Sequence, residues 1–193
     1  MRLPLIIAAL AVTTAAPAYA QDFTGPRVEA NVAYDRVETD VLLPGTPDHA
    51  DGVRLGGAVG YDVAVGNVVT IGAEAGIGWT LGDRERATVG ATRVSVDSGR
   101  DIELSLRLGA RVAPRTLVYA KGGWANTRFT GEVRNASGTV TTSVREDEDG
   151  FRLGAGVEQS LGGRLYAKGE YRYTDYGDDV RRHQALLGFG VRF

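Results

Sequence analysis

Residues 102–112 of this chain read IELSLRLGARV, and an apolar residue stands at every even-numbered position of the stretch. A polar, charged or glycine residue stands at every odd-numbered position. Side chains of a β-strand point alternately to the two faces of a sheet, whereas helical side chains repeat about every 3.6 residues. The stretch therefore predicts a strand with one apolar and one charged face.

The same alternation recurs in seven further runs along the chain. These are residues 28–34, 53–61, 69–79, 118–124, 153–157, 165–173 and 185–193. No charged residue falls on the apolar face of any run. The opposite faces carry Glu29, Arg54, Glu74, Glu103, Arg107, Arg111, Lys121, Arg152, Glu158, Lys168, Glu170, Arg172 and Arg192. An even number of antiparallel strands closes into a barrel without free edges. We therefore predict an all-β fold, an eight-stranded antiparallel up-and-down transmembrane β-barrel.

Glycine placement indicates which face of the strands is outside. The chain has 27 glycines, about twice the usual share of roughly 7 per cent, and they crowd the charged face. Glycine weakens a strand that faces water, but inside a narrow barrel it leaves room for charged side chains. We expect the charged face to line the lumen. The alternative is a secreted soluble lipocalin-like barrel, in which the apolar face surrounds a ligand.

The connections between the runs alternate in length. Residues 64–67, 113–116 and 161–163 form short connections, whereas 38–51, 82–100, 130–150 and 175–182 form long ones. Short periplasmic turns and long extracellular loops are typical of outer-membrane barrels. Aromatic residues near the strand ends predict two interfacial girdles. One girdle contains Tyr34, Trp79, Trp124 and Tyr173, and the other contains Tyr61 and Phe193.

The first twenty residues differ from the rest of the chain. Arg2 precedes an apolar segment that runs to Ala16, and Ala18 and Ala20 form an A-x-A cleavage pattern before Gln21. We therefore predict a cleavable signal peptide over residues 1–20 and one barrel domain over residues 21–193. The chain has no cysteine, so it has no disulfide framework. Its net charge of −2 does not favour a nucleic-acid partner.

Three segments resemble the small OmpA-like, opacity-type outer-membrane β-barrel proteins, often called the porin or surface-antigen family of α-proteobacteria. They are LVYAKGGW at 117–124, LYAKGEYRYTDYG at 165–177 and LGFGVRF at 187–193. The resemblance implies a Gram-negative outer-membrane location, in contact with membrane lipid and lipopolysaccharide. It also implies that Leu187, Phe189, Val191 and Phe193 form the signal by which the barrel-assembly machinery recognises the last strand.

The polar loop residues do not form an enzyme motif. The two histidines are His49, which lies beside Asp48 and Asp51, and His183, and neither has a catalytic partner pattern. The acidic run 146–149 and Asp178-Asp179 read as solvated loop residues rather than a cation site. Asn135-Ala136-Ser137 reads as a turn, and Arg181-Arg182 as a contact for lipid headgroups. We predict no enzyme activity, no cofactor and no metal site.

The lumen of an eight-stranded barrel is only wide enough to be filled by side chains. The eight basic and five acidic residues assigned to it above should therefore form a salt-bridge network rather than an open pore. This favours a structural or surface-interaction protein whose long extracellular loops meet a host or surface ligand. A narrow porin-like channel for small solutes is the second hypothesis, and the soluble lipocalin-like binder is the third.

Overall fold

The computed structural model describes residues 23–39, 49–81, 85–89, 92–134, 140–177 and 180–193. The predicted signal peptide at 1–20, the predicted turn at 135–137 and the pair Asp178-Asp179 lie outside these residues. The strands are β1 (Gly25–Thr39), β2 (His49–Val65), β3 (Val69–Leu81), β4 (Glu85–Val89), β5 (Thr92–Ala113), β6 (Thr116–Arg134), β7 (Val140–Gly162), β8 (Leu165–Asp175) and β9 (Val180–Arg192).

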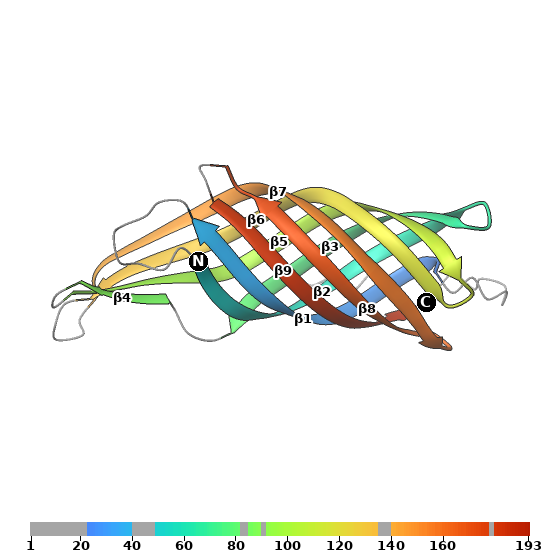
Figure 1. The fold of residues 1–193 in the computed structure, drawn as a ribbon, viewed down its shortest axis with the longest axis horizontal. Helices are drawn as coiled ribbons and strands as arrows, with labels where there is room; N and C mark the ends of the chain where they lie inside the picture. Colours follow the sequence, from blue (N-terminus) through green and yellow to red (C-terminus); the bar gives the residue numbers. More distant parts are fainter. Residues whose placement is uncertain (1–22, 40–48, 82–84, 90–91, 135–139, 178–179) are drawn as a thin grey trace, which may run out of the picture.

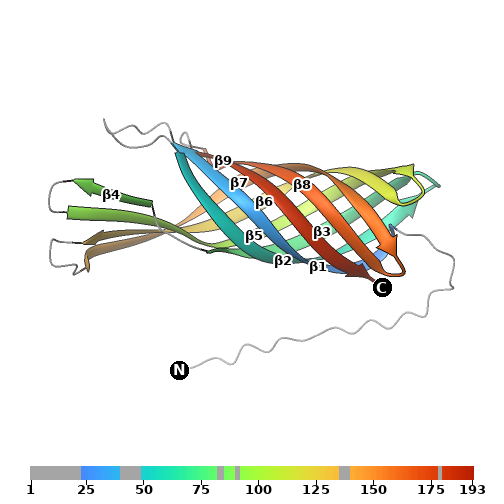
Figure 2. The ribbon, with the colours of Figure 1, turned by 60° about the horizontal axis from the view of Figure 1, so that its bottom comes forward.

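Eight of these strands close into a barrel (Figures 1 and 2). Each pairs antiparallel with the next along the chain, except that β3 pairs with β5, and β1 pairs with β9 to complete the ring. These eight strands contain the eight alternating runs except for the final residue, Phe193, so the predicted fold class is confirmed. No helix among the described residues is long and apolar enough to cross a membrane.

The short connections gather at one end of the barrel, which we call the turn end. The turns there lie at residues 66–68, 114–115 and 163–164, as the sequence predicted within one or two residues. Gly66 and Gly163 adopt positive φ angles of 71° and 61°, a conformation that side chains other than glycine rarely tolerate. The chain ends at Phe193 beside this end of the barrel (Figure 1). The opposite end carries the long connections and is called the loop end.

At the loop end, three strands continue past the barrel, which corrects the prediction that residues 82–100 and 130–150 are only connections. The β6–β7 ladder continues beyond Phe151, where β7 stops pairing with β8, as far as Arg134↔Val140. Strand β4 pairs with the start of β5. At about 3.3 Å per residue the projecting part of the ladder is roughly 30 Å long. We call β4 and the projecting parts of β5–β7 the loop-end sheet (Figure 2).

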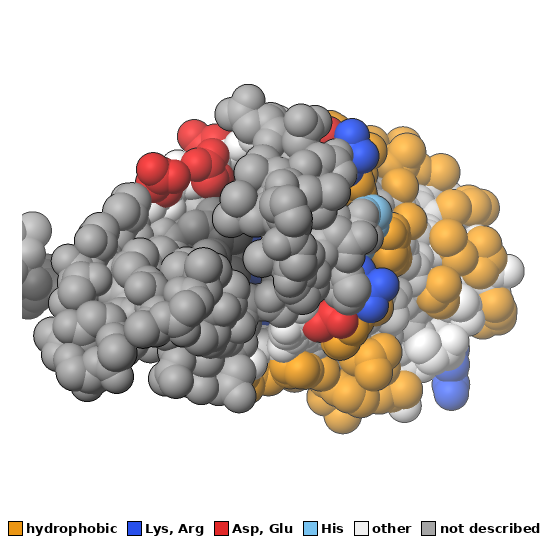
Figure 3. Space-filling model, turned by 60° about the vertical axis from the view of Figure 1, so that its left-hand side comes forward, with side chains coloured by type: hydrophobic (Ala, Val, Ile, Leu, Met, Phe, Trp, Pro, Cys, Tyr) orange, Lys and Arg blue, Asp and Glu red, His pale blue; other side chains and the backbone are white. Residues whose placement is uncertain are grey.

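The apolar faces of the strands point outward. Leu106 is 71% exposed and Phe189 65%, whereas the inward-pointing Lys121 is 4% exposed. Figure 3 shows hydrophobic side chains over the barrel wall. Such an exposed apolar band is unfavourable in water and is the surface expected in contact with lipid. The lipocalin-like hypothesis is therefore wrong, because it requires the apolar face to line the interior.

The predicted girdle residues lie on the outer wall. Tyr34, Tyr61, Trp79, Trp124 and Phe193 are each between 45% and 63% exposed. Tyr173 is half-buried because its ring packs against the imidazole of His183, with 5.2 Å between the ring centroids. Their role as interfacial girdles stays a prediction.

Candidate functional site

The lumen contains charged side chains of both signs. Nine cationic residues are buried there, namely Arg27, Arg54, Arg107, Lys121, Arg152, Lys168, Arg172, Arg182 and Arg192. Eight acidic residues are buried with them, namely Glu29, Asp35, Asp62, Glu74, Asp101, Glu103, Glu158 and Glu170. The alternation of each strand directs these side chains inward, and closure of the barrel brings them together from opposite walls.

The middle of the lumen is organised around two lysines. The Nζ of Lys121 lies 2.6 Å from a carboxylate oxygen of Glu74, 2.5 Å from Glu103 and 2.9 Å from Glu170. The Nζ of Lys168 lies 3.0 Å from Glu170 and also contacts Glu29 at 2.7 Å. Each ammonium therefore donates to carboxylates from different strands, so the lysines link the walls of the barrel.

A second cluster lies toward the turn end and is centred on two carboxylates. Oδ2 of Asp62 is 3.0 Å from Arg27, 2.8 Å from Arg192 and 3.6 Å from Arg107. The carboxylate of Glu158 forms ion pairs with the guanidinium groups of Arg107 at 2.7 Å and Arg192 at 2.8 Å. The guanidinium of Arg107 also lies 3.8 Å above the ring of Tyr119, a cation–π geometry. Three guanidinium groups thus share two carboxylates in this part of the lumen.

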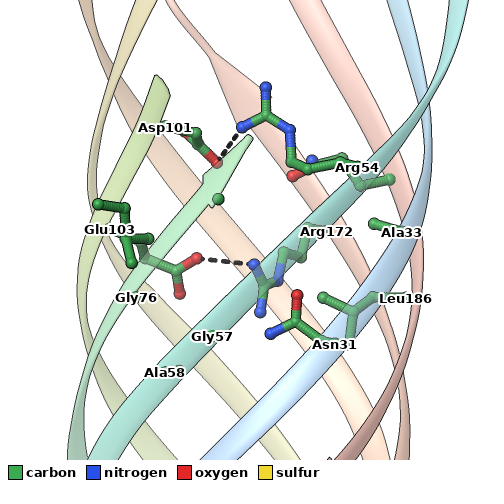
Figure 4. A pocket seen from close by; sticks show the side chains of 13 residues that line it. Asn31, Ala33, Arg54, Gly57, Ala58, Gly76, Asp101, Glu103, Arg172 and Leu186 are labelled. Atoms are coloured by element: carbon green, nitrogen blue, oxygen red, sulfur yellow. Dashed lines mark ion pairs between the residues drawn. The ribbon is translucent and has the colours of Figure 1, made fainter. Parts of the chain in front are cut away.

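A third cluster closes the lumen toward the loop end. Asp101 lies 3.0 Å from Arg152 and 2.9 Å from Arg54. The Nε of Arg182 donates to Oδ1 of Asp35 at 2.6 Å. Figure 4 shows the pair of Arg54 and Asp101 above a pair of Arg172 and Glu103, for which the shortest distance is 3.0 Å.

Little free space remains between the middle and loop-end clusters. The cavity lined by Arg54, Asp101, Glu103 and Arg172 (Figure 4) has a volume of about 20 Å³. That is room for about one water molecule. A hydrated solute does not fit in this cavity.

Glycines make room for the charged side chains, as the sequence predicted. A Cβ atom at Gly72 would lie 2.0 Å from Oδ1 of Asp62, and one at Gly60 would lie 2.8 Å from the guanidinium carbon of Arg27. Non-bonded heavy atoms do not approach this closely, so any larger residue at Gly72 displaces the Asp62 carboxylate or the strand.

The structure brings twelve of the thirteen residues assigned to the lumen network into contact with an oppositely charged partner. They are Glu29, Arg54, Glu74, Glu103, Arg107, Lys121, Arg152, Glu158, Lys168, Glu170, Arg172 and Arg192. The exception is Arg111, which is partly exposed and lies near the ring of Phe23 at 5.6 Å. Within the described residues it contacts no carboxylate.

Five charged lumen residues were missing from the sequence assignment. They are Arg27, Asp35, Asp62, Asp101 and Arg182. The first four lie an even number of residues from an assigned inward position, so continuing the alternation one or two steps further would have found them. Arg182 was instead expected to touch lipid headgroups, which is wrong because its side chain is buried against Asp35. With these five residues added and Arg111 left out, the buried network has nine cationic and eight acidic residues, so the expected basic excess of the lumen nearly disappears.

The described part of the loop-end sheet carries exposed polar pairs between β6 and β7. Arg128 donates from Nε to Oδ1 of Asp147 at 2.8 Å, and Asn126 donates to Asp149 at 2.8 Å. The hydrogen bond from Arg128 lowers the pKa of the Asp147 carboxyl and raises that of the guanidinium. With Glu146 exposed beside them, these side chains make the β7 edge of the sheet acidic, and Figure 3 shows acidic side chains gathered on this end of the molecule.

No strand in the described part of the chain pairs with the outer edge of β7 before Phe151. Among the described residues, β7 pairs with β6 along residues 140–150, but its ladder with β8 begins only at Phe151. A row of N–H and C=O groups on an unpaired edge can accept a further strand.

Of the two histidines, only His183 has a side chain that the structure describes. The Nδ1 of His183 shares a 2.6 Å hydrogen bond with the hydroxyl of Tyr171 at the loop end of the wall. Nothing is described of the side chain of His49. That the protein is not an enzyme stays a prediction.

The model of one known protein family matches most of the chain. The family model described as "Outer membrane protein beta-barrel domain" matches residues 5–193. The chain belongs to this family. The predicted membership among small OmpA-like barrels and the outer-membrane location are thereby confirmed, whereas the α-proteobacterial origin and the signal peptide stay predictions. No curated protein matches the chain.

Solved structures of outer-membrane proteins have a similar fold. The attachment invasion locus protein Ail of Yersinia pestis is 16% identical over 88% of this chain and 99% of its own, with a TM-score of 0.59. Neisserial surface protein A is 15% identical over 88% and 98%, with a TM-score of 0.59. OprG of Pseudomonas aeruginosa is 12% identical over 88% and 97%, with a TM-score of 0.53. At these identities the likeness shows the fold alone.

Proposed function

We propose that this outer-membrane barrel is a surface-interaction protein, in which a rigid, filled barrel anchors the loop-end sheet and the sheet binds a partner outside the cell. The observation that supports this most directly is the open backbone edge of β7 over residues 140–150. The arrangement of short turns at one end and long strands at the other supports an orientation with the turn end in the periplasm.

The filled lumen supports the anchoring role and weighs against the channel hypothesis. The three charge clusters join opposite walls, and the cavity between two of them holds about one water molecule. A conducting path would require several buried ion pairs to separate. Breaking one such pair in a desolvated site costs about 3–5 kcal/mol.

The chemistry of the β7 edge indicates the kind of partner. An extended peptide can add to an open sheet edge through backbone hydrogen bonds, and the exposed carboxylates of this edge complement basic side chains. A structure of Ail was determined in complex with the heparin analogue sucrose octasulfate. The acidic β7 edge does not suit such a polyanion, so we assign it a basic protein segment instead.

Two further roles belong to the same proposal. Leu187, Phe189 and Phe193 are each more than 60% exposed on the outer wall, with Val191 partly exposed between them, which supports a role as the assembly signal of the last strand. The exposed apolar wall supports contact with membrane lipid and, at the loop end, with lipopolysaccharide.

Bacteria displaying the protein provide the test. Flow cytometry measures binding of a fluorescent extended peptide with alternating lysine and valine residues, and the matched control peptide has glutamate in place of lysine. We expect the lysine peptide to bind and the double variant Glu146→Lys/Glu148→Lys to lose that binding. A charge reversal at Asp175, which is exposed on β8, should have no effect. Equal binding by both peptides, or by the double variant, would show the proposal to be wrong.

A further inference from the structure

Two grooves run along the outer wall from the turn end toward the middle of the barrel. The first has a volume of about 510 Å³ and is lined mainly by apolar residues, including Ala30, Leu161, Leu165 and Phe189. The second has a volume of about 320 Å³ and includes Gly169 and again Phe189. Because Phe189 lines both, the two grooves adjoin each other along β8 and β9.

We call the two adjoining grooves together the outer channel; it lies on the outer wall and is not a pore through the lumen. Small residues form its floor, and large exposed side chains form its sides. Leu161, Leu165 and Phe189 are 54%, 56% and 65% exposed, so they stand out from the wall, while Ala30 and Gly169 lie low between the strands. A Cβ atom at Gly169 would meet nothing nearer than a Leu187 methyl at 3.9 Å. Space therefore remains above this glycine, whereas the lumen-side glycines are closely packed.

An arginine lies in the turn next to these grooves. Arg164 is exposed between β7 and β8 and directly precedes Leu165, which lines the first groove. Its carbonyl oxygen accepts a hydrogen bond from the backbone nitrogen of Arg192 at 2.8 Å, which holds the turn beside the end of β9. Within the described part of the chain no carboxylate pairs with Arg164.

We propose that the outer channel binds one anionic glycerophospholipid, with a phosphate of the headgroup at Arg164 and an acyl chain along the first and then the second groove. The location supports a lipid, because the exposed apolar wall meets hydrocarbon and the turn meets the headgroup layer. An arginine at that boundary can extend toward phosphate while its stem stays on apolar surface. Recognition then combines one charge with a long apolar contact, which a free anion cannot provide.

A second copy of the chain fits the outer channel less well. A two-fold dimer over this wall would place a second Arg164 in the same interface, where like charges oppose association. The proposal is independent of any external partner, since it concerns the opposite end of the barrel.

Native mass spectrometry of the full chain, folded in detergent micelles, tests the proposal. Phosphatidylglycerol and phosphatidylcholine with the same acyl chains are added at equal concentrations. We expect one phosphatidylglycerol to bind about fivefold more tightly than phosphatidylcholine. Arg164→Gln should abolish that preference, whereas Arg115→Gln, which removes the exposed arginine of another turn, should preserve it.

Two variants that fill the outer channel test the acyl-chain contact. Ala30→Phe and Gly169→Leu should each weaken binding of both lipids, and Ala120→Phe, on the outer face of β6 away from the outer channel, should not. The gel shift between boiled and unheated samples identifies variants that fold, and either filling variant suffices for the comparison.

Several results would overturn the proposal. They are equal affinity of the wild type for both lipids, an equal loss in the Arg115 and Arg164 variants, and unchanged binding in the folded filling variants. Displacement of the lipid by excess glycerol phosphate would indicate a site for a free anion. A dimer that the filling variants dissociate would indicate a second copy of the chain as the occupant.

Discussion

Replacing Lys121 by methionine tests whether the lumen network is desolvated. The substitution conserves the length of the side chain but removes the charge that contacts three carboxylates at 2.5–2.9 Å. Removing one partner from a buried ion pair costs about 3–5 kcal/mol. Each carboxylate keeps another cation: Arg27 lies 2.7 Å from Glu74, Arg152 lies 3.0 Å from Glu103, and Lys168 lies 3.0 Å from Glu170. We therefore expect Lys121→Met to destabilise the barrel by the lower end of this range, about 3 kcal/mol.

The assay measures the free energy of reversible unfolding by guanidinium in lipid or detergent. Tryptophan fluorescence monitors the unfolding. A second variant, Lys121→Met/Glu74→Gln, removes one of the carboxylates left behind and should recover part of the loss, since coupled residues are not additive. The control is Arg128→Met, which removes an exposed ion pair with Asp147 and should leave the unfolding midpoint unchanged within error. If Lys121→Met lowers the free energy of unfolding no more than this control does, the lumen is hydrated and the reasoning is wrong.

Three further predictions follow from the structure. Gly72→Ala should destabilise the barrel by about 2 kcal/mol, because its Cβ would lie 2.0 Å from a lumen carboxylate oxygen, whereas the gel shift of Gly169→Ala should match the wild type. In planar bilayers neither the wild type nor Arg107→Ala should give stepwise conductance, because the middle and loop-end clusters still fill the lumen without Arg107; steps in the wild type would favour the channel hypothesis. The pKa of Asp147 is held below its usual value of about 3.9 by Arg128. The ion pair therefore stabilises the fold fully above that pH, and this stabilisation is lost as the pH falls through the lower folded-state pKa. An NMR titration should show a higher pKa of Asp147 in Arg128→Gln.

Most of the barrel was predictable because its strands obey one local rule. In residues 102–112 the alternation identifies both the strand and the inward side of each residue, without knowledge of any neighbour. The same rule assigned Lys121 and Glu74 to one lumen. It was applied too narrowly at strand ends, where Asp35 and Asp62 continue the pattern beyond the apolar run that defined the strand.

The loop-end sheet was harder to predict. Residues 82–100 and 130–150 carry polar and charged residues at both even and odd positions, so they lack the contrast that marks a membrane strand. Outside the membrane a strand can be polar on both faces, and its stability comes from pairing with β6 rather than from burying one face. Pairing of this kind is a tertiary property, and local alternation does not reveal it.

Alternation along each strand was thus sufficient to assign an apolar outer face and a charged inner face, since that choice depends only on the direction of successive side chains. The partners within the lumen depended on closure and register. Arg107 meets Glu158 across 51 positions, and Arg182 meets Asp35 across 147. Such pairs form only when β1 and β9 join and the tilt of the strands sets which residues share a level of the barrel. The acyl-chain groove likewise exists only where side chains of neighbouring strands, distant in sequence, stand beside one another.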